Sequence, residues 1–321
     1  MGEFVTFGET PLLLSPPRRA RLERTGELQV RADGVESNAA VAAHALGTRA
    51  VWVSVLPDSP LGHRVRSAVD AEGVRTDVSW VDPTGCRQAL VFGESTRQPR
   101  ERRRLRDQTG TPIAAVTPED LPMDRVRGAD MLLTGLNTAV RSQESAETTT
   151  ALLRAGRGGG ARTAVALEHA AGLDDPEVYR GVFEELAAEA DITFVGEADA
   201  RAVLDLDDRW RDLASRLTVE YGLDIAVVFR SGHGAVAMED STRAGVVHER
   251  AGAGTEPVDT AGEYGALVGG VCSGLLGGDT IATALDTGLA AAGLVRAVDS
   301  PFLSVTDGGI DAAIDRVVDG Q

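Results

Sequence analysis

The sequence predicts an α/β protein with a doubly wound, mostly parallel sheet, helices on both faces of that sheet and a small separate β-sheet. Two observations predict this fold. Short apolar runs alternate with amphipathic helical stretches along most of the chain, and strands that alternate with helices form parallel sheets. Two early segments interrupt the alternation and contain no helix that could serve as a crossover.

The apolar runs and helical patterns give a definite element order. The buried strands are expected at Val5–Gly8, Ala50–Leu56, Met131–Thr134, Ala164–Leu167, Ile192–Val195 and Ile225–Phe229. The helices between them are expected at Ser37–Leu46, Leu61–Ala71, Ser142–Arg154, Pro176–Ala188, Ala198–Leu204 and Asp208–Tyr221. Two antiparallel edge strands, Val236–Glu239 and Val246–Glu249, then precede helices at Gly262–Leu276, Ile281–Val295 and Ile310–Val318.

The two interrupting segments are Leu12–Arg31 and Gln88–Arg106. Leu28 and Val30 alternate with polar residues, as in a strand that has one face in water. We therefore expect one domain over residues 1–321, with a small β-sheet lid formed by about residues 10–34 and 84–112.

The charge composition indicates a salt-rich environment. The net charge is −17, from 49 acidic and 32 basic residues, and the chain contains no lysine. Codon bias toward arginine explains the missing lysine but not the acidic excess. In molar salt the Debye length falls to about 3 Å, so that self-repulsion of such a surface is screened. We expect a halophilic protein, and the acidity argues against nucleic acid as a partner.

Other classes are also disfavoured by the sequence. No apolar stretch approaches the ~20 residues that span a bilayer, so no membrane partner is expected. The first residues have no signal-peptide pattern, which predicts a cytoplasmic location. Cys86 and Cys272 are far apart and predict neither a disulfide framework nor a zinc site.

A glycine-rich helix start is the first candidate site. Gly34 precedes a helix that carries Asn38 one turn later. A glycine there lets backbone N–H groups approach a ligand, and an amide side chain both donates to and accepts from sugar hydroxyls. The structural alternative is an ordinary helix cap with a satisfied asparagine.

The stretches Trp52–Gly62 and Ala71–Val74 follow this helix start. Taken together, the helix start and these two stretches resemble the first signature region of PfkB carbohydrate kinases. In that family a strand ends in G-D-x-x-G and a helix ends in E-G-V; here Pro57 stands for the first glycine, and Asp33 stands for one of the paired glycines before the helix. The opening Thr6–Glu9 and the segment 107–111 resemble the 2-keto-3-deoxygluconate kinase branch. The resemblance implies a ribokinase-like fold and transfer of the γ-phosphoryl group of ATP, with Mg²⁺, to a sugar or sugar acid.

The stretch 258–267 resembles the second signature of the family, D-T-x-G-A-G-D-x-F. In the family its small residues form an anion hole at a helix N-terminus, and its last aspartate takes the proton from the sugar hydroxyl. Gly262 is retained as an anion-hole candidate. Glu263 and Tyr264 replace two small residues, and Gly265 replaces the catalytic aspartate, so no catalytic residue is intact.

The nucleotide-side motifs are altered as well. The family's N-x-x-E segment is Gly196 to Asp199 here, and its K-x-G-x-x-G segment is 229–234 without the lysine. The resemblance makes Asp199, Ser231 and Gly234 the nucleotide-binding candidates. No residue is assigned to a metal, and the cofactors are ATP and Mg²⁺ if the chain is active.

A basic run lies in the predicted lid. It comprises Arg97, Arg100, Arg102, Arg103, Arg104 and Arg106. Such a run is usually a solvated face, but in a lid it suits an anionic ligand. Gln108 stands for the arginine of the family's R-A-G-S segment, and Arg106 shares its strand face, so both are substrate-binding candidates. A homodimer through the lid is a further expectation, since such lids often pair in related kinases.

Three functions remain open from the sequence. The first is a sugar or sugar-acid kinase, and the second is a catalytically inactive sugar- or nucleotide-binding regulatory protein on the same fold. The third is altered chemistry that uses Glu263 or Glu168, the latter with His169. Glu263 is expected to point away from position 265, because two residues on a helix are about 200° apart. The motif alone therefore predicts little ADP release, and Gly265→Asp alone is expected to restore little.

The composition makes a direct prediction about salt. The melting temperature should rise steeply with KCl, because carboxylate repulsion is unscreened at low ionic strength. Thermal melts across a KCl series measure this. A melting temperature that stays flat or falls with salt contradicts the prediction.

Overall fold

The computed structural model describes residues 2–17, 20–94, 103–168, 175–240, 245–252, 254–306 and 308–320. Its main element is a nine-stranded sheet with the order β13-β12-β11-β10-β9-β8-β1-β4-β5. The strands are β1 (Glu3–Phe7), β4 (Arg49–Pro57), β5 (Arg75–Val81), β8 (Met131–Gly135), β9 (Arg162–Leu167), β10 (Ile192–Gly196), β11 (Ile225–Arg230), β12 (Gly234–Glu239) and β13 (Val246–Ala251). Neighbouring strands from β5 to β11 pair in parallel, whereas β12 and β13 pair antiparallel at one edge. The six predicted buried strands and both edge strands are confirmed.

The sheet has one strand that the sequence analysis missed. Strand β5 pairs in parallel with β4 at the other edge. Five of its seven residues are half-buried and its end residues are exposed, because it lies at the edge of the sheet. Its sequence therefore lacks the continuous apolar run that marks the inner strands.

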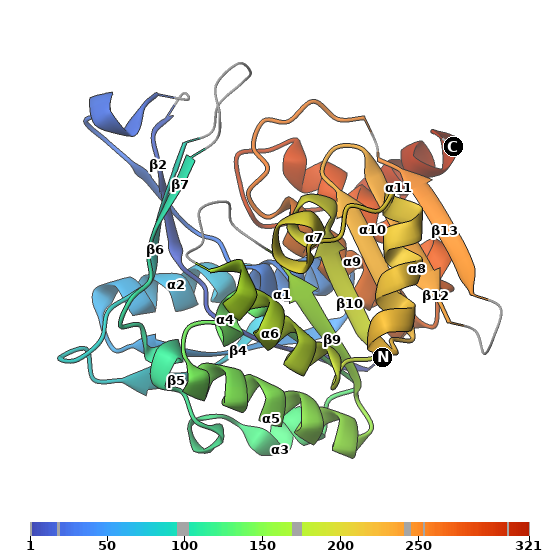
Figure 1. The fold of residues 1–321 in the computed structure, drawn as a ribbon. Helices are drawn as coiled ribbons and strands as arrows, with labels where there is room; N and C mark the ends of the chain where they lie inside the picture. The colour runs from blue at the N-terminus through green and yellow to red at the C-terminus, as the bar shows by residue number, and fades with distance from the viewer. Residues whose placement is uncertain are drawn as a thin grey trace.

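Helices cover both faces of the sheet, as expected for alternating strands and helices (Figure 1). One face packs against α1 (Val35–Ala45), α2 (Pro60–Asp70), α9 (Glu263–Gly277), α10 (Ile281–Arg296) and α11 (Gly309–Asp319). The other face packs against α3 (Met123–Arg127), α4 (Leu136–Ala139), α5 (Gln143–Gly159), α6 (Pro176–Ala187), α7 (Glu197–Leu204) and α8 (Trp210–Tyr221). Phe194 points into the first core and its neighbour Val195 into the second, since side chains alternate along a strand.

A second, four-stranded sheet stands away from the main one (Figure 1). Its order is β3-β2-β6-β7, with β2 (Leu12–Ser15), β3 (Gln29–Ala32), β6 (Leu90–Glu94) and β7 (Arg103–Asp107). Strands β2 and β6 come from the two early segments and pair in parallel, and β3 and β7 flank them antiparallel. The predicted small sheet is therefore confirmed. Strand β7 carries Arg104 and Arg106 toward the main body.

None of the helices within the described ranges has both the length and the apolar character that a bilayer-spanning helix needs.

Helices α1 and α9 approach each other closely through glycine. A Cβ added at Gly265 would lie 2.5 Å from the Cβ of Asn38 and 3.0 Å from the carbonyl oxygen of Val35. A Cβ added at Gly269, one turn later, would lie 2.3 Å from the carbonyl oxygen of Ala39. Any side chain at position 265 therefore forces the two helices apart or displaces the start of α1.

We expect Gly265→Asp to destabilise the fold by about 1–3 kcal/mol, the usual cost of overpacking a tight contact. Gly277→Ala is the matched control, because no described atom outside its own helix lies within 4 Å of a Cβ at that end of α9. The control should be neutral or stabilising by up to about 1 kcal/mol. Chemical denaturation at fixed KCl measures both. A Gly265→Asp protein as stable as the unmodified chain would show that the helices separate freely.

Candidate functional site

Two adjoining pockets lie at the carboxyl ends of the central strands, which is where ligands bind in open α/β sheets. The inner pocket lies among the start of α1, strands β6 and β7 of the small sheet, the ends of β8 and β9, and the start of α9. The outer pocket lies among the end of β10 and the start of α7, the end of β11, and the start of α9. The second signature therefore lies between the two pockets.

The inner pocket brings together the predicted sugar-side residues. Gly34, Asn38, Arg106, Gln108, Gly262 and Gly265 all line it. Four carboxylates line it as well, those of Glu9, Asp33, Glu36 and Glu168, together with Arg104. Its free volume is about 60 Å³, and Val91, Arg104 and Arg106 of the small sheet form part of its lining.

The start of α1 has the geometry expected for a binding loop. A Cβ at Gly34 would lie 2.7 Å from the carbonyl oxygen of Glu9, so this position needs glycine. Asn38 donates from Nδ2 to Oδ1 of Asp33 at 2.8 Å. Its own Oδ1 is buried without a hydrogen-bond partner. A buried amide oxygen without a donor suits a ligand hydroxyl.

Arg106 and Gln108 contact each other, as their spacing predicted. Nη1 of Arg106 donates to Oε1 of Gln108 at 3.3 Å, although Gln108 lies one residue beyond the end of β7. Gln108 donates in turn to Oε2 of Glu9 at 3.1 Å. Burial lowers the pKa of the Arg106 guanidinium, with the neighbouring arginines 104 and 141 acting in the same direction and Glu168 opposing them. Nε of Arg106 is buried without a partner.

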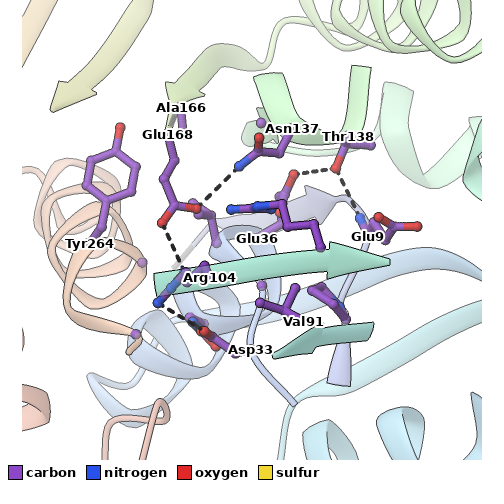
Figure 2. Close-up of a pocket in the computed structure, with 18 of the residues that line it drawn as sticks. Glu9, Asp33, Glu36, Val91, Arg104, Asn137, Thr138, Ala166, Glu168 and Tyr264 are labelled. Atoms are coloured by element: carbon purple, nitrogen blue, oxygen red, sulfur yellow. Dashed lines mark hydrogen bonds and ion pairs between the residues drawn. The ribbon is translucent and has the colours of Figure 1, made fainter. Parts of the chain in front are cut away.

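A buried acidic network under the pocket escaped the sequence analysis. Thr138 donates to Oε1 of Glu36 at 2.7 Å and accepts from the backbone N–H of Glu9 at 3.0 Å (Figure 2). Gly8 and Gly135 make room for the Glu36 carboxylate, because a Cβ at either position would lie within 2.6 Å of it. Gly8 directly follows β1 and Gly135 ends β8. These two glycines were the signal in the sequence that could have identified the network.

Arg104 and Glu168 lie at the border between the two pockets. They line both pockets, as do Thr260 and Tyr264. Arg104 lies between two carboxylates, with Nη2 3.7 Å from Oδ2 of Asp33 and Nη1 4.0 Å from Oε1 of Glu168 (Figure 2). Burial lowers the pKa of Arg104, but the carboxylates of Asp33, Glu168 and Asp259 outweigh it and raise that pKa overall. Arg104 therefore stays charged.

The outer pocket is larger and more open, with a free volume of about 610 Å³. Of the predicted nucleotide-side residues, Asp199 and Ser231 line it. Gly234 instead begins β12 and lines a separate small cavity beside Leu289 and Arg296. A Cβ at Gly234 would lie 2.0 Å from the carbonyl oxygen of Arg250, so its glycine is required by the strand pairing.

The altered signature has a definite geometry. The Glu263 carboxylate accepts from Oγ of Ser231 at 2.6 Å, from the Gly232 N–H at 3.2 Å and from Nη1 of Arg296 at 2.9 Å. It lines the outer pocket and not the inner one, so it points away from position 265 as predicted. The Tyr264 hydroxyl donates to the backbone carbonyl oxygens of Leu167 and Phe194, at 3.1 and 2.7 Å. No carboxylate therefore occupies position 265.

Four residues named in the sequence analysis lie outside the part of the chain that the structure describes. His169, the suggested partner of Glu168, lies outside the described residues, as do Arg97, Arg100 and Arg102 of the basic run.

A family model for pfkB family carbohydrate kinases matches residues 1–304. The chain belongs to the PfkB family of carbohydrate kinases. A 2-dehydro-3-deoxygalactonokinase of Haloferax volcanii is 37% identical to this PfkB chain over 321 residues, covering 98% of it and 99% of the relative.

Solved PfkB-like structures share the fold at lower identity. A 2-dehydro-3-deoxygluconokinase of Thermotoga maritima has a TM-score of 0.85 at 22% identity, covering 98% of this chain and all of that one. A candidate ribokinase II of Escherichia coli, solved with ATP and Mg²⁺, has a TM-score of 0.84 at 13% identity, with 98% and 100% coverage. The predicted ribokinase-like fold is confirmed.

The buried network predicts a specific pH dependence of stability. Burial raises the pKa of Glu36 from 4.5 to about 7, against the lowering effect of the hydrogen bond from Thr138. A raised pKa means that the folded chain holds this proton more tightly than the unfolded chain does. The contribution of the protonated Glu36 carboxyl to the free energy of unfolding is therefore full below about pH 4.5, and it is lost as the pH rises to about 7.

We expect Glu36→Gln to remove this loss, because glutamine stays neutral and still accepts from Thr138. Relative to the unmodified chain, the variant should gain up to about 3 kcal/mol between pH 4.5 and 8. Denaturant titrations at several pH values and fixed KCl measure the difference. Burial also raises the pKa of Glu9, so the variant keeps part of the slope. Parallel pH curves for the two proteins would contradict the prediction.

Proposed function

We propose that the chain phosphorylates a 2-keto-3-deoxy sugar acid. ATP is the phosphoryl donor, and it binds as its Mg²⁺ complex. The observation that carries the proposal is the pair of adjoining pockets, a closed polar one and an open one, that meet at the start of α9. Kinase transfer depends mostly on positioning two substrates and on stabilising charge, which is what two such pockets provide. The Haloferax relative supports the substrate class.

The inner pocket suits an acidic, hydroxyl-rich ligand. Arg106 offers a buried Nε that has no partner, and charge-assisted hydrogen bonds from arginine to a carboxylate are strong. The amide oxygens of Asn38 and Asn137 are buried and equally unpartnered, so each can accept from a sugar hydroxyl. A ligand that supplies a carboxylate and several hydroxyl groups satisfies all three.

Substrate entry requires the small sheet to move. A free volume of about 60 Å³ lies far below the ~300–1,000 Å³ usual for ligand pockets. Arg104 and Arg106 cover the pocket from strand β7. We propose that β7 and its sheet act as the lid of one kinase domain, opening to admit the sugar acid.

The outer pocket suits a magnesium–nucleotide complex. Its volume lies within the range of about 300–1,000 Å³ usual for cofactor pockets. Asp199 lines it and would face the metal, and the first N–H groups of α9 have no partner within the helix. Bound Mg²⁺ would neutralise charge on the transferring phosphates. Within the described residues no cluster of three acidic, histidine or cysteine side chains forms a protein-only metal site, which fits a metal carried by the nucleotide.

A second candidate function is ligand binding without turnover. Gly265 favours this function because it supplies no proton acceptor. The Glu263 carboxylate favours it as well, because it lies beside the proposed nucleotide site and is held there by hydrogen bonds from Arg296 and Ser231. Loss of a general base typically costs ~10²–10⁴-fold in rate, which by itself leaves a slow kinase rather than none. We therefore expect slow turnover.

The deciding experiment combines two measurements in molar KCl. Coupled ADP release is recorded with 2-keto-3-deoxygalactonate and 2-keto-3-deoxygluconate, and calorimetry measures binding of each acid and of ATP separately. We expect slow ADP release that depends on the sugar acid. Arg106→Gln should weaken sugar-acid binding about 10–100-fold, because a hydrogen bond to a charged group is worth about 1.5–3 kcal/mol. It should leave ATP binding unchanged.

Arg154→Gln is the matched control, because Arg154 pairs with Glu189 outside the lining of both pockets. Binding of the acid without any ADP release would favour the non-catalytic function. Binding of neither ligand would contradict both functions.

A further inference from the structure

The loss of the carboxylate at position 265 leaves open which group takes the proton from the acceptor hydroxyl. Direct transfer requires that hydroxyl to lie where the sugar pocket meets the nucleotide pocket. Among the described residues, four line both pockets: Arg104, Glu168, Thr260 and Tyr264. A side chain that lines both pockets is the best placed to reach the reacting oxygen.

Only Glu168 in this set is suited to accept a proton. The Tyr264 hydroxyl is held by two backbone carbonyls, and burial raises its pKa well above its ordinary value. The threonine hydroxyl is not basic, and Arg104 is a cation. Glu168 directly follows β9, and its side chain is 31% exposed, so its carboxylate reaches the cleft.

Four other carboxylates are less well placed for this step. Glu9, Asp33 and Glu36 line the inner pocket but not the outer one. Glu263 lines the outer pocket only, and three donors already hold its carboxylate. Glu168 has looser contacts, since it accepts from Nδ2 of Asn137 at 3.3 Å and lies 4.0 Å from Arg104.

We propose that Glu168 is the general base of the phosphoryl transfer and that Arg104, carried in by the small sheet, stabilises the transferring phosphoryl group. The inference rests on the proposed function. The acceptor O–H bond breaks and its proton passes to the Glu168 carboxylate. A new O–P bond forms to the γ-phosphorus of the nucleoside triphosphate, and the bond from that phosphorus to the bridging oxygen breaks. The nucleoside diphosphate leaves with that electron pair.

The contacts of Arg104 suit this role. Its separations of 3.7 and 4.0 Å from Asp33 and Glu168 are longer than hydrogen bonds, so its N–H groups can still bind phosphoryl oxygens. In the arrangement seen here two carboxylates flank the guanidinium at the border, which reduces the reorganisation needed when charge develops. The same arginine shields Glu168 from the negative nucleotide.

The test uses the full chain in molar KCl, with sugar-acid calorimetry and ADP release across pH. Glu168→Gln should lower kcat about 10²–10⁴-fold, change sugar-acid Kd by less than about 3-fold and remove the acidic limb of the pH–rate profile. Arg104→Gln should lower kcat about 10²–10³-fold while keeping that limb. Glu189→Gln and Arg154→Gln, which alter an ion pair outside both pockets, should leave kcat unchanged.

Asp33→Asn is the decisive comparison, because Asp33 flanks Arg104 on its other side. We expect this variant to keep the acidic limb. If Asp33→Asn loses the limb while Glu168→Gln keeps it, the base is Asp33 and the inference is wrong. If the unmodified chain turns over and Glu168→Gln retains both kcat and the limb, the inference alone fails. If the unmodified chain releases no ADP with any sugar acid, the proposed function and this inference fail together.

Discussion

The close packing of α1 against α9 is the constraint on which the site depends. Gly265 and Gly269 let the two helices approach until an added Cβ would meet backbone or Cβ atoms of α1 at 2.3 to 3.0 Å. This contact joins the two halves of the inner pocket, since α1 supplies Gly34 and Asn38 and α9 supplies its start. An aspartate at position 265 would need space that this packing does not provide, so the glycine there serves the packing.

Two large side chains hold the start of α9 beside that contact. Tyr264 anchors the start of α9 to the ends of β9 and β10 through two carbonyls. Glu263 anchors the same turn to the loop after β11 and to Arg296. The first turn of α9 is thus fixed by two large side chains. Charge at the border comes instead from Arg104 and Glu168, which belong to β7 and to the end of β9.

The sequence predicted the buried parts of this molecule better than its edges and its cleft. Apolar runs marked the inner strands because both faces of a parallel sheet are buried, while β5 escaped notice because an edge strand lacks that pattern. Motif spacing identified Gly34, Asn38 and Arg106, all of which line one pocket. The sequence did not predict the network of Glu36, Thr138 and Glu9. Thr138 is 102 residues from Glu36 and 129 residues from Glu9, so only the fold brings them together.

The small sheet is tied mechanically to the altered signature. Arg31 of β3 donates from Nη2 to Asp259 at 2.9 Å and also binds Asp299. Burial alone would raise the pKa of Asp259, but Arg31 and the N–H groups of Ala261 and Thr260 lower it, so the pair stays charged. Because β3 and β7 belong to one sheet, the lid motion that we propose would also pull on the loop that leads into α9. The small sheet also packs Leu13 and Val91 against Ala261 of this loop, so the ion pair and this apolar contact together join the sheet to the start of α9.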